Sequence, residues 1–361
     1  MRLIDMDTHY APPDEFAYVP DDLKDFTPAF LPQGQGKVAM VTPNWPQQPI
    51  GRGLTRPHNR FKGDYDMDAR LKDMDALGVE RQLLNPEFGQ YAYETEPRLA
   101  AEMCKSANFA IGKAMKAHPD RFIGSAVLPT QNIKGTLEEC DRCLEAGFQT
   151  FFMKAGQGGK NFDDQYFWPL WDVANENKVP ISVHANTRDW GTVCDPKRMG
   201  DSWGFFVATL ADYLTITCGM IYTGAFDVFP DLKICLGEAG ATWLPWLWDR
   251  LTLTYDVTPR TRSETQKHPT EYLLSNIYVT VDPTEESLGH LCQRFPNMKT
   301  LMMGTDYPHG DITGRGQTPD KVGTLKATHI DLLLEREDLS DEDKENIGYK
   351  NALEFLGGRV K

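Results

Sequence analysis

The sequence predicts an α/β protein built as a (β/α)8 TIM barrel, with a long insertion after the first strand and extra C-terminal helices. Eight short apolar segments alternate with helix-like segments along the 361 residues. These short segments do not alternate polar and apolar residues, which is typical of a parallel sheet buried on both faces. A doubly wound open sheet would usually carry a Gly-rich phosphate loop after its first strand, and none is present. We therefore expect one barrel domain over residues 1–361.

The first strand is the apolar run that begins at Leu3 and ends in Asp7-Thr8-His9. Residues 10–64, which follow it, are rich in Pro, Gly and aromatic residues and show little periodicity. A long irregular segment in a compact domain is often a lid or a binding insertion. We expect a partial lid here, and the alternative is a surface excursion without a catalytic role.

Regular structure resumes at Asp66, where Met67, Leu71, Met74 and Leu77 follow helical spacing up to Gly78. The remaining strands are expected at residues 79–84, 121–128, 148–153, 179–183, 232–236, 277–281 and 300–303. The remaining helices are expected at residues 97–118, 135–146, 167–175, 205–222, 242–256 and 285–295, with two C-terminal helices at 319–335 and 341–356.

Composition narrows the class of partner. The net charge of −14 disfavours nonspecific binding to nucleic acid or to an anionic membrane. No apolar run approaches the roughly 20 residues that span a bilayer, and Met1-Arg2 does not begin a signal-peptide pattern. The cysteine count of seven, odd and scattered, argues against a disulfide framework. We expect a cytoplasmic protein that acts on a small molecule.

Polar residues stand where the predicted strands end. Asp7 and His9 are two residues apart and therefore share one face of the first strand. In a barrel all strand ends meet at one mouth, which here would collect Asp7, His9, Lys154, His184, Glu238 and Asp306. Each alone is ordinary, because a strand-end Asp often caps a helix. Two imidazoles and several carboxylates together would suit Zn, Mn or Fe(II).

Three stretches resemble the amidohydrolase superfamily, in the branch that includes aminocarboxymuconate-semialdehyde decarboxylase and related decarboxylases. They are IDMDTH at 4–9, FPDLKICLGEAGATWLP at 229–245 and GTDYPH at 304–309. The resemblance implies that Asp7 and His9 are the first two metal ligands and that His184 is the strand-5 ligand. It also implies that Asp306 binds metal or handles the proton of a water.

The chain departs from that family pattern in three places. Glu238 stands where many of these decarboxylases have a His after strand 6, and it is either a further ligand or a general base. Ala11-Pro12-Pro13 stands where relatives often have a Glu. Lys154 stands where some dinuclear members have a carboxylated lysine, so one or two ions are expected. We favour Lys154 as a partner for a substrate carboxylate or as part of a structural ion pair.

Three further residues follow the strand ends closely. His309 is a catalytic candidate that would orient the substrate or hydrogen-bond a ligand, and the alternative is a loop His bonded to backbone. Asn186 and Arg188 could bind an anionic substrate group; for Arg188 the alternative is a loop surface charge.

The sequence thus predicts a metal-dependent hydrolase or decarboxylase of a small carboxylated or acyl substrate, in which the ion activates a water or holds the substrate. In the hydrolytic version Asp306 or Glu238 moves the proton. One alternative is a dinuclear non-haem Fe or Mn/Fe oxygenase of the same superfamily. The other is a catalytically silent barrel subunit of a hetero-oligomer with a paralogous subunit. The resemblance also implies a homodimer formed through barrel helices.

Overall fold

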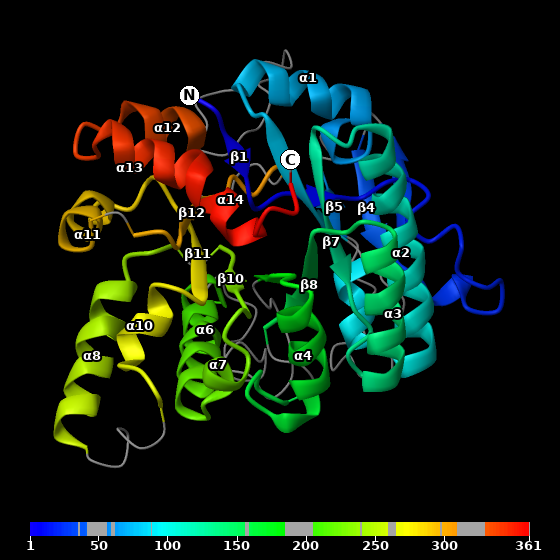
Figure 1. The fold of residues 1–361 in the computed structure, drawn as a ribbon. Helices are drawn as coiled ribbons and strands as arrows, with labels where there is room; N and C mark the ends of the chain where they lie inside the picture. The colour runs from blue at the N-terminus through cyan, green and yellow to red at the C-terminus, as the bar shows by residue number, and fades with distance from the viewer. Residues whose placement is uncertain are drawn as a thin grey trace.

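In the computed structural model of the chain, the described residues are 1–34, 37–41, 56–58, 62–87, 89–155, 159–184, 205–238, 240–258, 265–296, 298–308 and 329–360. Their main feature is a parallel barrel with helices around it (Figure 1). The strand order is β1-β6-β7-β8-β9-β10-β11-β12, and β2 continues the first strand and pairs with β6. The strands are β1 Ile4–Asp5, β2 His9–Tyr10, β6 Arg81–Pro86, β7 Phe122–Val127, β8 Thr150–Lys154, β9 Ile181–His184, β10 Ile234–Leu236, β11 Ile277–Val281 and β12 Leu301–Met303.

Backbone hydrogen bonds join the first strand to the last and close the barrel. The amide of Met6 donates to Met303 O at 2.9 Å, and the amide of His9 donates to Tyr307 O at 2.6 Å. In the other direction, the amide of Asp306 donates to Asp7 O at 2.9 Å. The closure therefore brings the segment that carries His9 against the segment that carries Asp306.

Helices connect the strands and cover the barrel. The first, α1, begins after Asp66, whose side chain accepts from the Ala69 amide at 3.0 Å, and it ends at Gly78 with φ 69°. The helices are α1 Met67–Leu77, α2 Pro97–Ala117, α3 Ile133–Glu145, α4 Trp168–Glu176, α6 Phe205–Tyr222, α7 Ala225–Val228, α8 Leu244–Val257, α10 Pro269–Leu273, α11 Leu288–Arg294, α12 His329–Glu335, α13 Asp341–Glu345 and α14 Asn351–Leu356. Among the described residues, no helix is long and apolar enough to cross a membrane.

Apolar side chains fill both the barrel and the layer around it. Inside the barrel, Ile4, Leu83, Ile123 and Met302 form one cluster, and Phe355 of α14 packs against it. A larger cluster joins the outer strand faces to the surrounding helices. Because both faces of the sheet are buried, the strands read as continuous apolar runs rather than as alternating ones.

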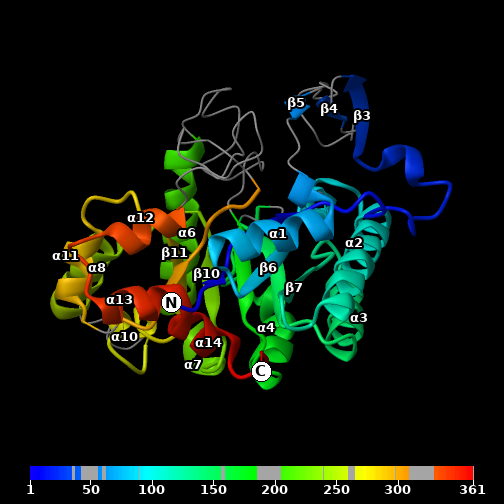
Figure 2. The ribbon, with the colours of Figure 1, turned by 90° about the horizontal axis from the view of Figure 1, so that it is seen from above.

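The segment after β2 is more regular than the sequence predicts. It contains an antiparallel sheet of β3 Ala29–Gly34, β4 Lys37–Val41 and β5 Arg56–His58, which stands to one side of the barrel (Figure 2). Short 3-10 turns, η1 Lys24–Phe26 and η2 Lys62–Asp64, flank this sheet. The β4 sequence KVAMV is apolar and partly β-branched, which favours a strand. That this segment acts as a lid stays a prediction.

Several predicted boundaries shift by a few residues, and one helix is divided. The second strand extends to Pro86 because β2 pairs beside Asn85 and Pro86. Further 3-10 turns, η3 Gly89–Glu94 and η4 Gln165–Phe167, precede α2 and α4. The helix expected at 341–356 is interrupted by a π-helical turn, η5 Asn346–Lys350. Of the helix expected at 319–335, residues 319–328 lie outside the described residues.

Candidate metal centre at the barrel mouth

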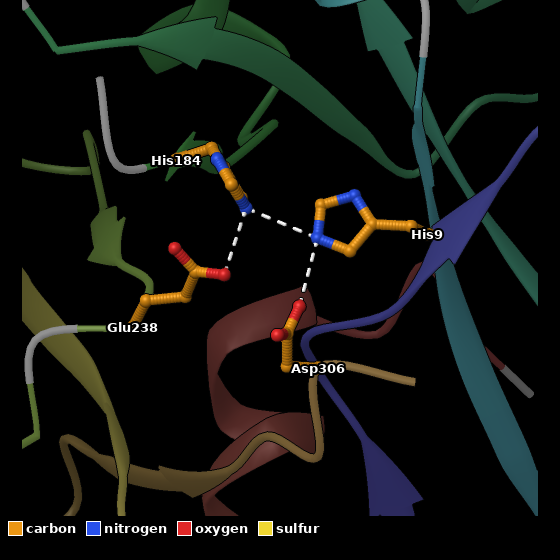
Figure 3. Close-up of side chains that lie close together, drawn as sticks. All are labelled: His9, His184, Glu238 and Asp306. Atoms are coloured by element: carbon orange, nitrogen blue, oxygen red, sulfur yellow. Dashed lines mark hydrogen bonds and ion pairs between the residues drawn. The ribbon is translucent and has the colours of Figure 1, made fainter. Parts of the chain in front are cut away.

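Four of the predicted residues meet at the strand ends: His9, His184, Glu238 and Asp306 (Figure 3). One ligand atom from each lies within 4.8 Å of the others. His9 Nε2 lies 3.0 Å from His184 Nε2 and 3.1 Å from Asp306 Oδ1. His184 Nε2 lies 3.4 Å from Glu238 Oε1. Two imidazole nitrogens and two carboxylate oxygens therefore converge on one small volume.

These separations fit a single divalent ion. Ligand atoms about 2.1 Å from one ion, at near right angles to each other, lie roughly 3.0 Å apart. The His9 and His184 side chains are 0% and 6% exposed, so neither imidazole is a solvated surface group. A mixed nitrogen and oxygen set suits Zn, Mn or Fe(II). The four side chains could therefore hold the predicted ion.

The two carboxylates of the cluster sit on unusual backbone. Glu238 has φ 59° and Asp306 has φ 56°, and Lys178 is the only other non-glycine residue with positive φ in the described part of the chain. This left-handed conformation is unfavourable for residues with a Cβ, and it is found preferentially at functional sites. The Glu238 amide donates to Thr280 Oγ1 at 3.0 Å, which helps to hold the turn after β10.

Asp7, also a predicted ligand, lies beside the cluster but is not one of the four. Its carboxylate is buried and accepts from Asn85 Nδ2 at 3.2 Å. Burial raises the pKa of Asp7 to about 7; the His184 and His9 imidazoles oppose that rise, and the Glu238 and Asp306 carboxylates add to it. Its role as a metal ligand stays a prediction.

The His184 imidazole is influenced by burial and by charge in opposite directions. Burial lowers its pKa, but the Glu238 carboxylate raises it through charge and a hydrogen bond, and the net pKa shift is upward. Glu238 therefore favours a positive charge at His184, and a cation at the cluster would meet the same negative potential.

Lys154 also reaches this mouth. It ends β8, is 3% exposed and pairs in register with His184 of β9. Residues paired in register on neighbouring strands present their side chains to the same face. Lys154 therefore lies next to His184 at the barrel mouth. The other predicted residues, Asn186, Arg188 and His309, lie outside the described residues.

Two residues of the site were not predicted. Glu87 Oε2 lies 3.1 Å from His9 Nδ1, and Asn85 contacts Asp7. The sequence carries a signal for them. Asn85 and Glu87 are polar and stand at positions i and i+2 where their strand ends, as Asp7 and His9 do at the end of the first strand. On one strand each pair shares a face.

A closed parallel barrel with a His and carboxylate cluster at its strand ends is the architecture of a (β/α)8 enzyme with a metal-binding site. The Amidohydrolase family model matches residues 4–358, and the chain belongs to that family. It is an enzyme of the amidohydrolase superfamily, as the sequence predicts.

The curated relatives include two kinds of decarboxylase. The chain is 26% identical over 298 residues to 2-amino-3-carboxymuconate-6-semialdehyde decarboxylase of Dictyostelium discoideum, covering 81% of this chain and 77% of the relative. It is 25% identical over 284 residues to gamma-resorcylate decarboxylase of Rhodococcus jostii, covering 73% and 84% of the two chains.

Solved structures share the fold. The 2,6-dihydroxybenzoate decarboxylase from Rhizobium has a TM-score of 0.70 at 20% identity, with 99% of both chains covered. A dihydroxybenzoic acid decarboxylase from a Polaromonas species, with bound manganese and the inhibitor 2-nitroresorcinol, has a TM-score of 0.67 at 20% identity and covers 98% of this chain and 96% of its own.

Proposed function

We propose that this enzyme is a divalent-metal-dependent decarboxylase that removes a carboxylate from a small aromatic or similarly unsaturated acid. The observation that carries the proposal is the cluster of His9, His184, Glu238 and Asp306 at the barrel mouth. The decarboxylase relatives of the chain support the reaction. The manganese in the Polaromonas structure supports manganese as the ion.

In this proposal His9, His184 and Asp306 hold the ion, with Asp7 beside them, and Glu238 lies next to the ion as the proton donor. The ion supplies positive charge that polarises substrate oxygens. An anionic substrate also meets the negative charges of the site carboxylates. Lys154, buried next to His184, offers a cation of the protein itself, and we assign it to the substrate carboxylate.

Decarboxylation needs a proton at the carbon that loses the carboxylate. The carbon accepts the proton, the bond to the carboxylate breaks, and CO2 leaves. We assign the delivery of this proton to Glu238, which would donate it as a carboxylic acid and be left as a carboxylate. Among the three cluster contacts, the one between Glu238 and His184 is the longest, at 3.4 Å. Asp306, 3.1 Å from His9, is then primarily a ligand.

The test is CO2 release by purified protein loaded with Mn²⁺, over a panel of hydroxylated benzoates and unsaturated acids. We expect release with at least one acid, lost when a chelator removes the ion and reduced at least about 1,000-fold in His184→Ala. Glu139→Gln is the matched control, because Glu139 is a buried carboxylate of α3 that contacts Asn108, Arg142 and Cys143, away from the cluster.

Other outcomes would contradict the proposal. Hydrolysis of amides or thioesters without CO2 release would favour the hydrolase predicted as an option. Two ions per chain by metal analysis, with iron present, one ion lost in Glu238→Ala, and oxygen uptake, would favour the dinuclear alternative. The predicted role of Asp7 as a ligand has its own test, because retention of the metal in Asp7→Ala would show that Asp7 is not a ligand.

The cytoplasmic location and the assembly as a homodimer or as a hetero-oligomer with a paralogous subunit stay predictions. Size measurement of the purified chain, alone and with candidate paralogues, would test the assembly.

A further inference from the structure

The end of β6 runs beside the end of β2 and places two polar residues next to two residues of the first strand. His9 pairs in register with Asn85, and the Asn85 amide donates to Thr8 O at 3.0 Å. One step further, the Glu87 amide donates to Tyr10 O at 3.1 Å. These backbone bonds hold Asn85 and Glu87 at a defined offset from Asp7 and His9.

The side chains follow the same pairing. Asn85 Nδ2 donates to Asp7 Oδ1 at 3.2 Å, and Glu87 Oε2 lies 3.1 Å from His9 Nδ1. The His9 side chain is 0% exposed and that of Glu87 is 10% exposed, so little water competes for this contact. Figure 3 shows the second ring nitrogen of His9 on the side of the ring away from His184 and Asp306. Glu87 therefore lies on the Nδ1 side of the ring, and His184 and Asp306 lie on the Nε2 side.

This placement favours one of the two tautomers of the His9 imidazole. The 3.1 Å separation is short enough for a hydrogen bond, and because a carboxylate accepts hydrogen bonds and donates none, that bond would need a proton on Nδ1. In a neutral imidazole the other nitrogen then has a free lone pair. That nitrogen is Nε2, which faces His184 and Asp306. An imidazole binds a metal ion through an unprotonated nitrogen. A carboxylate that accepts a hydrogen bond from the other ring nitrogen also makes the imidazole a stronger ligand.

We propose that Glu87 is a positioning residue that holds His9 as its Nδ1–H tautomer, with Nε2 directed into the metal centre. Asn85 orients the Asp7 carboxylate by donating a hydrogen bond from Nδ2 to Asp7 Oδ1. The inference rests on the proposed metal centre. It assigns a role to the strand end of β6, to which the sequence assigned none.

The first test is the affinity for Mn²⁺, measured by titration of metal-free protein and followed by the EPR signal of free Mn²⁺. We expect Glu87→Ala to weaken binding about 10- to 100-fold. Glu87→Gln keeps an oxygen that can accept from Nδ1 but loses the charge, so its loss should be smaller than that of Glu87→Ala. Glu139→Gln should bind as the wild type does. Binding by Glu87→Ala within about threefold of the wild type would overturn the inference, and so would an equal loss in Glu139→Gln.

The second test needs no metal and no activity. In metal-free protein labelled with ¹⁵N-histidine, the ring nitrogen shifts report the tautomer, and His9→Gln identifies the His9 signals. We expect the wild type to show His9 protonated at Nδ1, Glu87→Gln to keep this tautomer and Glu87→Ala to lose it. A wild-type His9 protonated at Nε2 alone would overturn the inference.

The two tests separate this inference from the proposed function. If the wild type binds no divalent ion, the proposed function fails, while the ¹⁵N shifts still decide the role of Glu87. If Glu87→Ala does not fold, the wild-type tautomer and the Glu87→Gln affinity still decide it.

Discussion

At the scale of single residues, the site combines chemistry with backbone strain. Glu238 and Asp306 both adopt left-handed backbone in which their Cβ atoms are unfavourable. Each follows the end of its strand, and the turn directs the carboxylate toward the imidazoles. A residue selected for stability alone would be glycine at such positions. The presence of carboxylates indicates that the side chains are needed for function.

Replacement of Glu238 tests this trade between stability and function. Glu238→Gly should be about 1 kcal/mol more stable than Glu238→Ala, because glycine adopts φ 59° without a Cβ penalty. Both variants remove the carboxylate, so both should lose catalytic activity to a similar extent. Urea denaturation of metal-free protein measures the difference. Equal stability of the two variants would show that the strain is negligible.

At the scale of secondary-structure elements, Arg70 joins α1 to the strands beneath the site. Its side chain is fully buried. It donates to His9 O at 2.7 Å, to Thr8 Oγ1 at 2.7 Å and to Gln82 Oε1 at 2.9 Å. The planar guanidinium thus connects β2, β6 and α1 in one contact region. The position of the His9 backbone depends on a helix that begins 58 residues after it.

We expect Arg70→Lys to lower the free energy of unfolding by about 2–3 kcal/mol, because the ammonium cannot reach all of these acceptors and leaves buried groups unpaired. Arg98→Lys is the matched control, since Arg98 has a 61% exposed side chain and pairs with Asp22 at the surface. That control should change stability by less than about 0.5 kcal/mol. An Arg70→Lys protein as stable as the control would contradict the assigned role.

At the scale of the whole molecule, Asp5 holds together the seam at which the barrel closes. It accepts from the Thr305 amide at 3.0 Å and from Gln82 Nε2 at 3.2 Å, so it joins β1 to both of its neighbours. Burial raises the pKa of Asp5 to about 6, although these hydrogen bonds oppose the rise. The folded barrel therefore binds a proton at Asp5 more tightly than the unfolded chain does.

The consequence is a pH dependence of the stability of the fold. Since the folded pKa lies above the unfolded one, this contribution to stability decreases as the pH rises from about 4 to 6, by about 3 kcal/mol in total. From pH 7.5 to pH 5 the wild type should recover roughly half of that amount. Asp5→Asn should show a correspondingly smaller change in urea denaturation of chelator-treated protein. An equal change in both proteins would assign the pH dependence to other groups.

The sequence by itself determined the order of the barrel strands, most of the helices between them and most of the mouth. Continuous apolar runs indicate strands buried on both faces, and polar residues at their ends indicate which side chains meet once the barrel closes. His9, His184, Glu238 and Asp306 could be named in this way, because strand direction alone places them at one mouth. The helix expected at 205–222 coincides with α6 Phe205–Tyr222, since its continuous apolar pattern needs no distant partner to be recognised.

Only the tertiary structure decided which residues support that cluster. Glu87 and Asn85 read as an ordinary strand end until β6 is paired with β2, and Arg70 reads as a helix charge until α1 is packed against the barrel. The left-handed backbone of Glu238 and Asp306 likewise follows from the turns that the closed barrel imposes. A local pattern reports the periodicity of one segment. These contacts depend instead on the register between segments that lie far apart in the chain, which forms only on folding.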